Sequence, residues 1–265
     1  MSDQLITSVS NSTVKRIRLL RQRRERMEQG VFFVEGIRVV AEAIQTGADL
    51  EYLVVAPELL SSDFAQGLIA AKQHVRRLNV SSQVFASLSG KEGPQGLAAV
   101  IKQRWESLQD LQLQSDDLWV ALDAPQDPGN LGTIMRTADA VGAVGLILIG
   151  NSADPYDPGA VRASMGSLFA LRLIQTDLDS FLAWRHSTSV HLVGTAGGAA
   201  LHYRQASYQR PLILLSGSER QGLPQQLQND CDQLVRIPMV GRCDSLNLAV
   251  ATSVVLYQAF AQHAE

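Results

Sequence analysis

Three polar segments of this 265-residue chain, each directly after an apolar run, contain the residue types that could do chemistry. The first segment, residues 123–142 (DAPQDPGNLGTIMRTADAVG), combines Pro and Gly turn residues with the start of an amphipathic helix. We expect Asn130 to cap this helix, and Arg136 to lie on its polar side, about 9 Å further along at 1.5 Å per residue. A capped helix with a surface Arg explains such a pattern more often than a site does. The four Pro and Gly residues between positions 125 and 132 nevertheless exceed what a plain connection needs.

The second and third segments each add candidate polar groups. Glu219 is the one carboxylate of residues 214–223 (LLSGSERQGL), where a strand enters a loop bounded by glycines, and most such loops are only turns. Residues 237–249 (IPMVGRCDSLNLA) leave a strand and enter the last helix near Ser245, a residue type that usually serves as a cap. Asn247 is a poor helix former inside a first turn, so we expect its side chain to act as a hydrogen-bond donor or acceptor.

Several familiar catalytic signatures are absent from the sequence. A dinucleotide fingerprint, a P-loop and a G-x-S-x-G nucleophile elbow do not occur. His191 and His202 lack metal-ligand spacing, and Cys231 and Cys243 cannot supply a four-thiolate zinc site or a disulfide framework within one chain. The sequence therefore predicts no metal centre.

Composition and length indicate a soluble globular protein with two domains. Hydrophobic residues make up 46% of the chain and charged residues 18%. No apolar run approaches the roughly 18 residues of a membrane helix, and the start MSDQLITSVSNS has no secretory signal, so we expect a cytoplasmic protein. We expect domains over 1–101 and 118–265, because the polar, Gln-rich residues 102–117 form the best candidate for a linker.

Alternating apolar runs and helix-length segments predict an α/β fold for both domains. In the first domain the expected elements are helices over 12–29, 37–46 and 63–72 and strands over 31–34, 52–56 and 97–101. The long helix would carry Val14, Ile17, Leu20 and Met27 along one side. In the second domain the expected elements are strands over 118–122, 144–149, 190–194, 212–215 and 234–237 and a closing helix over 246–262. Short apolar runs of this kind favour a mostly parallel sheet with helices on both faces.

Positive charge is concentrated near the N-terminus. Residues 1–109 contain 14 Lys and Arg against 11 Asp and Glu, whereas residues 110–265 contain 9 against 15. Seven of the fourteen residues from 13 to 26 are basic, and six of these are Arg. A solvated helix explains most charge runs, but guanidinium groups suit phosphates, so we expect a polyanionic partner at this basic arm. The candidate contacts are Lys15, Arg16, Arg18, Arg21, Arg23, Arg24 and Arg38.

The three polar segments together resemble a known family. NLGTIMRTADAVGA, SGSERQGL and IPMVGRCDSLNLAVA, in this order, look like the three motifs of the SpoU (TrmH-like) RNA ribose 2'-O-methyltransferases of the SPOUT class. The segments ITSVSNSTVKRIRLLRQRRER, FFVEGIRVVAEAIQTG and GPQGLAAVI resemble that family's N-terminal substrate-binding domain, which is like a small RNA-binding ribosomal protein. The resemblance covers nearly the whole chain. It implies an α/β parallel-sheet domain whose C-terminal segment forms a deep trefoil knot.

The resemblance also implies S-adenosylmethionine (SAM) as the cofactor, held in the knot mostly by backbone groups. By motif match, the cofactor-binding residues are Thr195, Gly197, Gly217, Ile237, Met239 and Leu246. The catalytic candidates are Asn130, Arg136, Glu219, Ser245 and Asn247. The family's counterpart of Arg136 is held to assist deprotonation of the ribose hydroxyl. Because a guanidinium is a poor base, we expect Arg136 to stabilise the developing alkoxide or hold a phosphate instead, unless it is strongly desolvated.

Two classes of function are consistent with the sequence. The first is a SAM-dependent RNA 2'-O-ribose methyltransferase, working as a homodimer on RNA bound partly by the basic arm. Because the first domain adds positive charge suited to a structured RNA, we expect ribosomal RNA, with transfer RNA as the alternative. The second class is a non-catalytic RNA-binding or ribosome-assembly factor on the same scaffold. The presence of all five catalytic candidates favours the enzyme.

Overall fold

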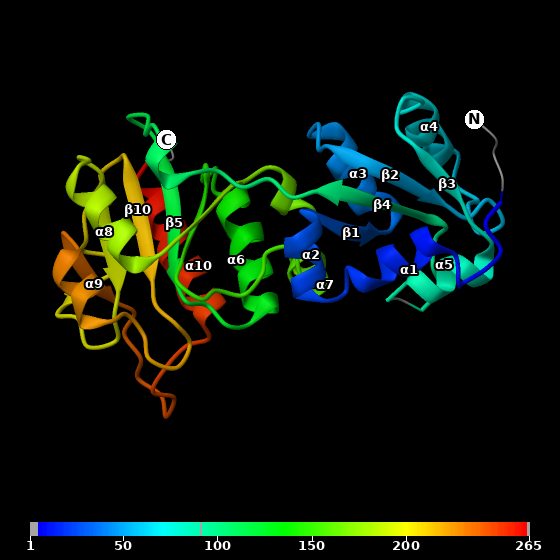
Figure 1. Ribbon diagram of the computed structural model, residues 1–265. Helices are drawn as coiled ribbons and strands as arrows, with labels where there is room; N and C mark the ends of the chain where they lie inside the picture. The colour runs from blue at the N-terminus through cyan, green and yellow to red at the C-terminus, as the bar shows by residue number, and fades with distance from the viewer. Residues whose placement is uncertain (1–4, 91, 264–265) are drawn as a thin grey trace. The chain divides into compact units, whose positions relative to one another are not determined.

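The computed structural model describes residues 5–90 and 92–263, and the chain divides into two compact units (Figure 1). Unit 1 comprises Met1–Gln103 together with Tyr156–Val161, and unit 2 comprises Arg104–Pro155 and Arg162–Glu265. The short segment Tyr156–Val161 therefore belongs to unit 1, although in the sequence it is separated from the rest of that unit by residues 104–155. Within the described residues no helix is both long enough and apolar enough to cross a membrane.

Unit 1 is built on a four-stranded sheet in the order β1-β4-β2-β3. Its elements are α1 (Ser12–Leu19), α2 (Arg23–Gln29), β1 (Val31–Glu35), α3 (Ile37–Gln45), β2 (Leu50–Val55), α4 (Asp63–Ala71), β3 (Arg77–Asn79), α5 (Ser82–Leu88) and β4 (Leu97–Lys102). Strand β4 runs antiparallel to β1 and β2, and β3 runs parallel to β2. The three predicted strands are confirmed. Strand β3 and helix α5 were not expected, because RLN is too short to show an alternating pattern.

The Arg-rich segment forms two helices, so the single helix predicted over 12–29 is wrong. The guanidinium of Arg26 is 1% exposed and donates to the carbonyls of Leu20 (3.0 Å) and Arg21 (2.9 Å), between α1 and α2. It also pairs with Asp157 Oδ2 at 3.3 Å. These bonds satisfy the donors of a buried guanidinium, which would otherwise be costly, and they fix the turn between the two helices. As a result, Met27 is 62% exposed and does not follow the predicted apolar side.

Unit 2 is a seven-stranded sheet, parallel throughout, in the order β7-β6-β5-β10-β8-β11-β9. Its elements are η1 (Leu108–Asp110), β5 (Leu118–Asp123), α6 (Pro128–Ala140), β6 (Gly145–Ile149), α7 (Pro158–Ser164), η2 (Ser167–Phe169), β7 (Arg172–Thr176), α8 (Leu178–His186), β8 (His191–Thr195), β9 (Leu201–His202), β10 (Leu212–Ser216), α9 (Gln225–Asp230), β11 (Gln233–Arg236) and α10 (Leu248–Ala261). Helix α7 begins within the part assigned to unit 1. The predicted parallel sheet is confirmed, and the trefoil knot stays a prediction.

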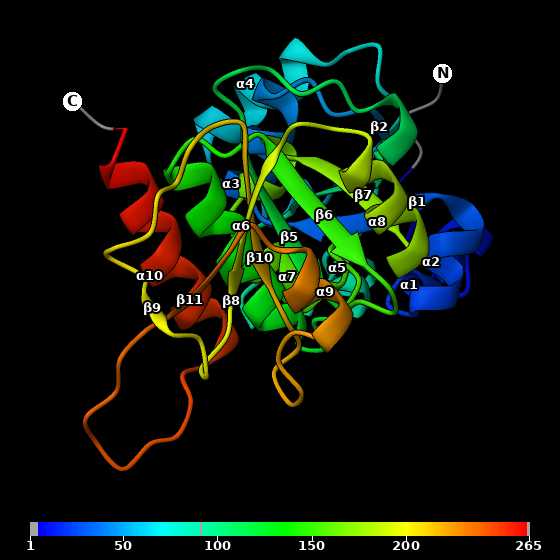
Figure 2. The same ribbon diagram turned by 90° about the vertical axis from the view of Figure 1, so that its left-hand side faces the viewer.

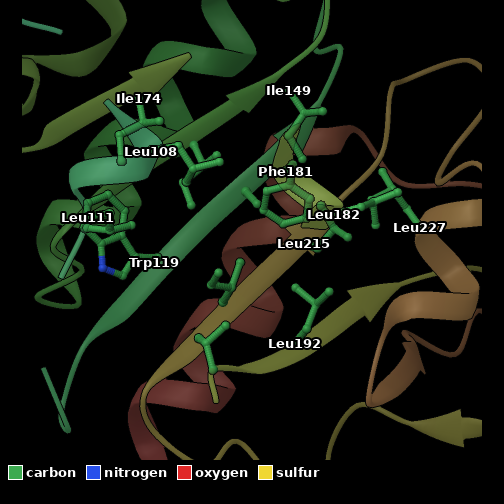
Figure 3. Packing of buried hydrophobic residues seen from close by; sticks show 14 of the residues in the cluster. Leu108, Leu111, Trp119, Ile149, Ile174, Phe181, Leu182, Leu192, Leu215 and Leu227 are labelled. Atoms are coloured by element: carbon green, nitrogen blue, oxygen red, sulfur yellow. The ribbon is translucent and has the colours of Figure 1, made fainter. Parts of the chain in front are cut away.

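Helices cover both faces of the unit 2 sheet, as expected. Helices α6 and α10 pack against each other on one face, and α8 and α9 lie on the other face (Figure 1). The core beneath α8 includes Trp119, Phe181 and Leu215 (Figure 3). Leu108 and Leu111 belong to the same core, although they fall in the expected linker 102–117. Part of that segment is therefore packed onto unit 2.

We predict that Arg26→Met lowers the free energy of unfolding by about 3–5 kcal/mol, because it removes the guanidinium that Asp157 Oδ2 and two backbone carbonyls share. Urea denaturation of the full chain measures this loss. The matched control is Arg24→Met, which removes an exposed ion pair with Glu28 and should change stability by less than about 1 kcal/mol. Equal urea midpoints for the two variants would contradict the structural role of Arg26.

Candidate active site

The three polar segments meet at one edge of the unit 2 sheet. They follow the carboxyl ends of β5, β10 and β11, which end at Asp123, Ser216 and Arg236. Because all of these strands are parallel, their carboxyl ends lie at the same edge, and such edges are where α/β proteins bind ligands. The fold therefore brings together segments that are about 90 to 120 residues apart in the sequence.

The start of α6 differs from the prediction. Asp127 caps the helix by accepting the backbone N–H of Asn130 at 2.6 Å, so the expectation that Asn130 is the cap is wrong. Pro128 takes the first helical position, where its missing N–H costs nothing. Asn130 therefore lies inside the first turn, and its amide side chain is available for contacts with other segments.

The carboxylate of Glu219 ties the loop after β10 to the start of α6. Its oxygens accept the backbone N–H of Gln126 (3.1 Å), the backbone N–H of Asp127 (3.3 Å) and Nδ2 of Asn130 (3.1 Å). Partial burial raises the pKa of Glu219, whereas the bonds from Asn130 and from backbone N–H groups lower it. The bonds together outweigh the burial, so the pKa of Glu219 is below the ordinary value. Glu219 is therefore an ionised hydrogen-bond acceptor at neutral pH.

Asn247 extends this arrangement to α10. It is the N-cap of that helix, and its Oδ1 accepts the backbone N–H groups of Ala249 (2.9 Å) and Val250 (3.3 Å). Its Nδ2 donates to Oδ1 of Asn130 at 2.9 Å. The prediction of a donor or acceptor role for Asn247 is confirmed, but its expected place inside the helix is wrong. We call Glu219, Asn130 and Asn247 the Glu219 network.

Arg136 and Ser245 lie outside the Glu219 network. Arg136 is exposed on α6, on the polar side as predicted, and its side chain has no hydrogen bond or ion pair within the described part of the chain. Beside it, Thr137 Oγ1 bonds Ser253 Oγ of α10 at 2.9 Å. Ser245 is exposed and donates to Asp244 Oδ1 at 3.2 Å. The site thus has a fixed network at the start of α6 and an unengaged guanidinium further along the same helix.

A cluster of hydroxyl groups, of which the sequence analysis named only Thr195, joins three elements beneath this edge. Thr195 at the end of β8 donates to Ser216 Oγ of β10 at 3.2 Å. Thr252 of α10, which is fully buried, donates to the same oxygen at 3.0 Å. The sequence held two signals for this cluster. Ser216 ends the otherwise apolar strand LILLS, and Thr252 lies inside the apolar closing helix. The cluster holds α10 against the strands whose loops were expected to bind the cofactor.

A hollow of about 720 Å³ lies beside the loop after β8. Residues 196–201 and 221–223 form much of its lining, together with Gln228 and residues 232–234. Gly197 belongs to this lining, and a Cβ there would meet nothing within 4 Å. A short run of Gly and Ala exposes backbone N–H and C=O groups, so this hollow suits a ligand recognised mainly through the backbone.

Gly217 is required by its own loop. A Cβ at this position would come within 2.0 Å of the carbonyl carbon of Gly222, because the loop closes on itself. That closure includes a bond from Gly222 N to Ser218 O at 3.0 Å. Substitution of Gly217 would therefore displace the loop that carries Glu219, whether or not a ligand is bound.

The remaining cofactor candidates lie on the connection between β11 and α10. Figure 2 shows this connection, residues 237–247, extending away from the sheet as a long loop. Met239 and Leu246 are 39% and 40% exposed, and Ile237 is half-buried. None of the three lines the hollow beside Gly197. The structure thus does not bring them together with Gly197.

The basic arm is only partly available to a partner. Arg16 pairs with Glu51 (2.6 Å) and Arg18 donates to Ser87 Oγ (2.9 Å). Arg21 donates to the carbonyls of Leu88 and Ser89, both at 3.0 Å, at the end of α5. These three guanidinium groups stabilise unit 1 itself. Lys15, Arg23 and Arg38 are exposed without a bonded partner in the described residues, and Arg24 is exposed in a pair with Glu28.

Comparison with known proteins assigns the family. The SpoU rRNA methylase family model matches residues 117–257, and the MRM3-like substrate binding domain matches residues 11–99. The chain is 34% identical to the 23S rRNA (uridine(2479)-2'-O)-methyltransferase of Streptomyces viridochromogenes, over 92% of this chain and 87% of that protein. It is 29% identical to the 23S rRNA (guanosine(2553)-2'-O)-methyltransferase RlmP of Bacillus subtilis, over 95% of this chain and 97% of that one.

Solved structures agree with this assignment. The AdoMet-bound rRNA methyltransferase from Sinorhizobium meliloti matches with a TM-score of 0.90 and 37% identity, over 99% of this chain and 98% of that chain. The SpoU methyltransferase AviRb from Streptomyces viridochromogenes, in complex with AdoMet, matches with a TM-score of 0.87 and 31% identity, over 96% and 98%. The chain belongs to the SpoU rRNA methylase family.

Two variants separate the functions of the Asn247 amide. Asn247→Ala removes both the cap of α10 and the bond to Asn130, and we expect it to cost about 1 kcal/mol of stability or more. Asn247→Asp retains the capping oxygen but lacks the Nδ2 donor, so it should lose less stability than the Ala variant. Thermal or urea denaturation of the two variants checks this order, and a larger loss in Asn247→Asp would contradict it.

Proposed function

We propose that this member of the SpoU rRNA methylase family transfers a methyl group from SAM to a ribose 2'-hydroxyl of ribosomal RNA. The observation that carries the proposal is the Glu219 network, because it joins the three motif segments of the family through side-chain bonds at the carboxyl edge of the sheet. The names of the Streptomyces and Bacillus relatives describe ribose methylation of 23S rRNA. Their similarity extends through both units of this chain.

The residues present fit SAM as the cofactor. The hollow beside Gly197 has a volume of about 720 Å³, within the usual range for small-ligand sites. Its Gly- and Ala-rich wall offers backbone donors and acceptors that can recognise an adenine edge. The exposed connection over residues 237–247 would have to move toward this wall for Ile237, Met239 and Leu246 to contact the same ligand.

The reaction is an in-line displacement at the methyl carbon, which bound SAM supplies as an electrophile. The ribose 2'-oxygen forms a bond to that carbon, the carbon–sulfur bond breaks, and S-adenosylhomocysteine leaves with the electron pair. The hydroxyl proton is lost to solvent or to a nearby base. The protein must therefore align the 2'-oxygen and favour its negative charge.

Arg136 is suited to favouring the negative charge that develops on the 2'-oxygen. Its guanidinium is exposed and unengaged within the described chain, so it can pair with a phosphate or with the developing alkoxide. Glu219 contacts Asn130 and no atom of Arg136, so its function is to fix the α6 N-terminus and not to orient the guanidinium. We assign the positioning of this edge to the Glu219 network and charge stabilisation to Arg136.

The substrate is assigned to the large ribosomal subunit. This assignment rests on the 23S rRNA named for the two relatives and on the MRM3-like substrate binding domain in unit 1. Of the seven candidate contacts, Lys15 and Arg23 of the arm and Arg38 of α3 are free to contact phosphates, with Arg24 as a fourth once it leaves Glu28. We therefore expect three or four phosphate contacts from this surface and not seven.

Helix α10 supports a homodimer. It exposes three large apolar side chains at helical spacing, Val250 (50%), Tyr257 (51%) and Phe260 (37%). A second copy of this chain would cover these side chains through a self-complementary contact. Such a contact would also place the partner beside Asn247, at the start of the same helix.

For catalysis, we predict that Arg136→Ala lowers the rate of methyl transfer at least tenfold while the SAM-induced rise in melting temperature stays unchanged. Arg136→Lys should recover little, because an ammonium cannot reproduce the planar fork. Methyl transfer to large-subunit rRNA, measured with labelled SAM, supplies the rate. A variant that keeps more than about a tenth of the wild-type rate loses less than about 1.4 kcal/mol of barrier stabilisation, too little for the assigned function.

For assembly, we predict that the wild-type chain is a dimer in light scattering and that Tyr257→Asp shifts it to monomer, because a carboxylate would be buried in an apolar contact. Phe64→Asp is the control, since Phe64 is equally exposed (57%) but lies on α4 of unit 1. A monomeric wild-type chain, or dissociation by both variants, would refute the α10 interface.

A further inference from the structure

Unit 1 contains a groove that is separate from the basic arm. The groove has a volume of about 1000 Å³ and lies between residues 5–13 and residues 73–79. Ile6 pairs in parallel with Val80, its N–H donating to Asn79 O at 2.8 Å and its carbonyl accepting from Ser81 N at 3.0 Å. The N-terminal segment is thereby held beside β3 as the second wall of the groove.

Two arginines and a histidine line one side of this groove, and hydroxyl and amide residues line the other. His74, Arg76 and Arg77 line the first side, and none of the described lining residues is a carboxylate. Thr7, Ser8, Asn11 and Thr13 line the facing side. Asn11 Oδ1 caps α1, and Ser8 Oγ bonds Ser10, so the Asn11 Nδ2 group and the Thr hydroxyls are the groups open to a ligand. In a protein of net charge −3, such a groove attracts an anion of extended shape.

The two arginines are available to a ligand, unlike Arg16 and Arg21 of the arm. Arg77 is exposed, and its side chain has no hydrogen bond or ion pair in the described part of the chain. It stands between this groove and a neighbouring hollow that Ile69 and Ala70 of α4 also line. Arg76 is also exposed, and its guanidinium lies 5.2 Å from the ring centroid of Tyr52, with Nη1 donating to the Tyr52 hydroxyl at 3.4 Å. The contact with Tyr52 orients the Arg76 guanidinium and leaves its other N–H donors open. The Arg76 side chain therefore loses less conformational entropy when it binds a ligand.

We propose that this groove binds the sugar–phosphate backbone of the RNA substrate, with Arg76 and Arg77 on phosphates and the hydroxyl side facing riboses. The proposal rests on the proposed function, because it takes the RNA of that reaction as the occupant. Phosphate and sugar contacts fix the position of an RNA without reading its sequence. Hydroxyl and amide side chains can also bond ribose 2'-hydroxyl groups, which distinguish RNA from DNA. Unit 1 would then hold its substrate at two surfaces, the groove and the free part of the arm.

The salt dependence of RNA binding tests the groove directly. Each lost phosphate contact reduces the slope of log K against log salt by about 1. We therefore expect a reduction of about 1 for Arg77→Gln and about 2 for Arg76→Gln combined with Arg77→Gln, measured by filter binding between about 50 and 200 mM salt. The probe is large-subunit rRNA transcribed in vitro, without SAM. Arg77→Lys, which retains the charge, should keep the wild-type slope.

Lys102→Gln is the matched control, because Lys102 is an exposed cation of unit 1 that pairs with Asp49 and does not line the groove. It should leave the slope unchanged. A wild-type slope for Arg77→Gln, a reduced slope for Arg77→Lys, or an equal reduction for Lys102→Gln would each overturn the proposal. The slope is independent of methyl transfer. If the wild-type chain binds no SAM and methylates no RNA, the proposed function fails, and that outcome is distinct from failure of the groove.

Discussion

The arrangement of the candidate active site depends on one carboxylate. Glu219 accepts two backbone N–H groups from the loop before α6 and one amide N–H from Asn130, which in turn accepts a bond from the cap of α10. These bonds join residues 89 to 117 positions apart, and no neutral side chain could satisfy the three donors equally well. Because the bonds favour the ionised form, the pKa of Glu219 is lowered, so their contribution to stability is complete above the ordinary pKa of a carboxyl group. It is lost as the pH falls through the lowered value.

The arginines of unit 1 serve two different purposes, which composition alone does not separate. Arg26 is buried at the turn between α1 and α2, and Arg16 and Arg21 bond to Glu51 and to the end of α5. These side chains contribute to folding. Arg76 and Arg77, outside the charge run, face a groove without carboxylates in the described lining. The density of positive charge along a sequence therefore does not show which arginines bond within unit 1 and which remain free for a partner.

Much of the fold could be predicted from apolar runs, because buried parallel strands are continuous hydrophobic segments. Strand β7 was missed because RLIQT is half polar. The order of the three polar segments predicted the family, which the comparisons confirm, whereas the functions assigned to the site residues stay predictions. The hydrogen bonds among them could not be predicted, since they join segments through the tertiary fold. For the same reason Asp127 and not Asn130 caps α6, and the buried Ser216–Thr252 bond became visible only in the structure.

The central claim is that Glu219 and Asn247 act through one network to hold the site. The most direct test is a double-mutant cycle on the rate of methyl transfer to large-subunit rRNA, with Glu219→Gln, Asn247→Ala and the combined variant. Residues of one network have non-additive effects. The account predicts that the combined variant is about as slow as the slower single variant. If the fold-loss in rate of the combined variant equals the product of the two single fold-losses, Glu219 and Asn247 act independently. That result would contradict the account.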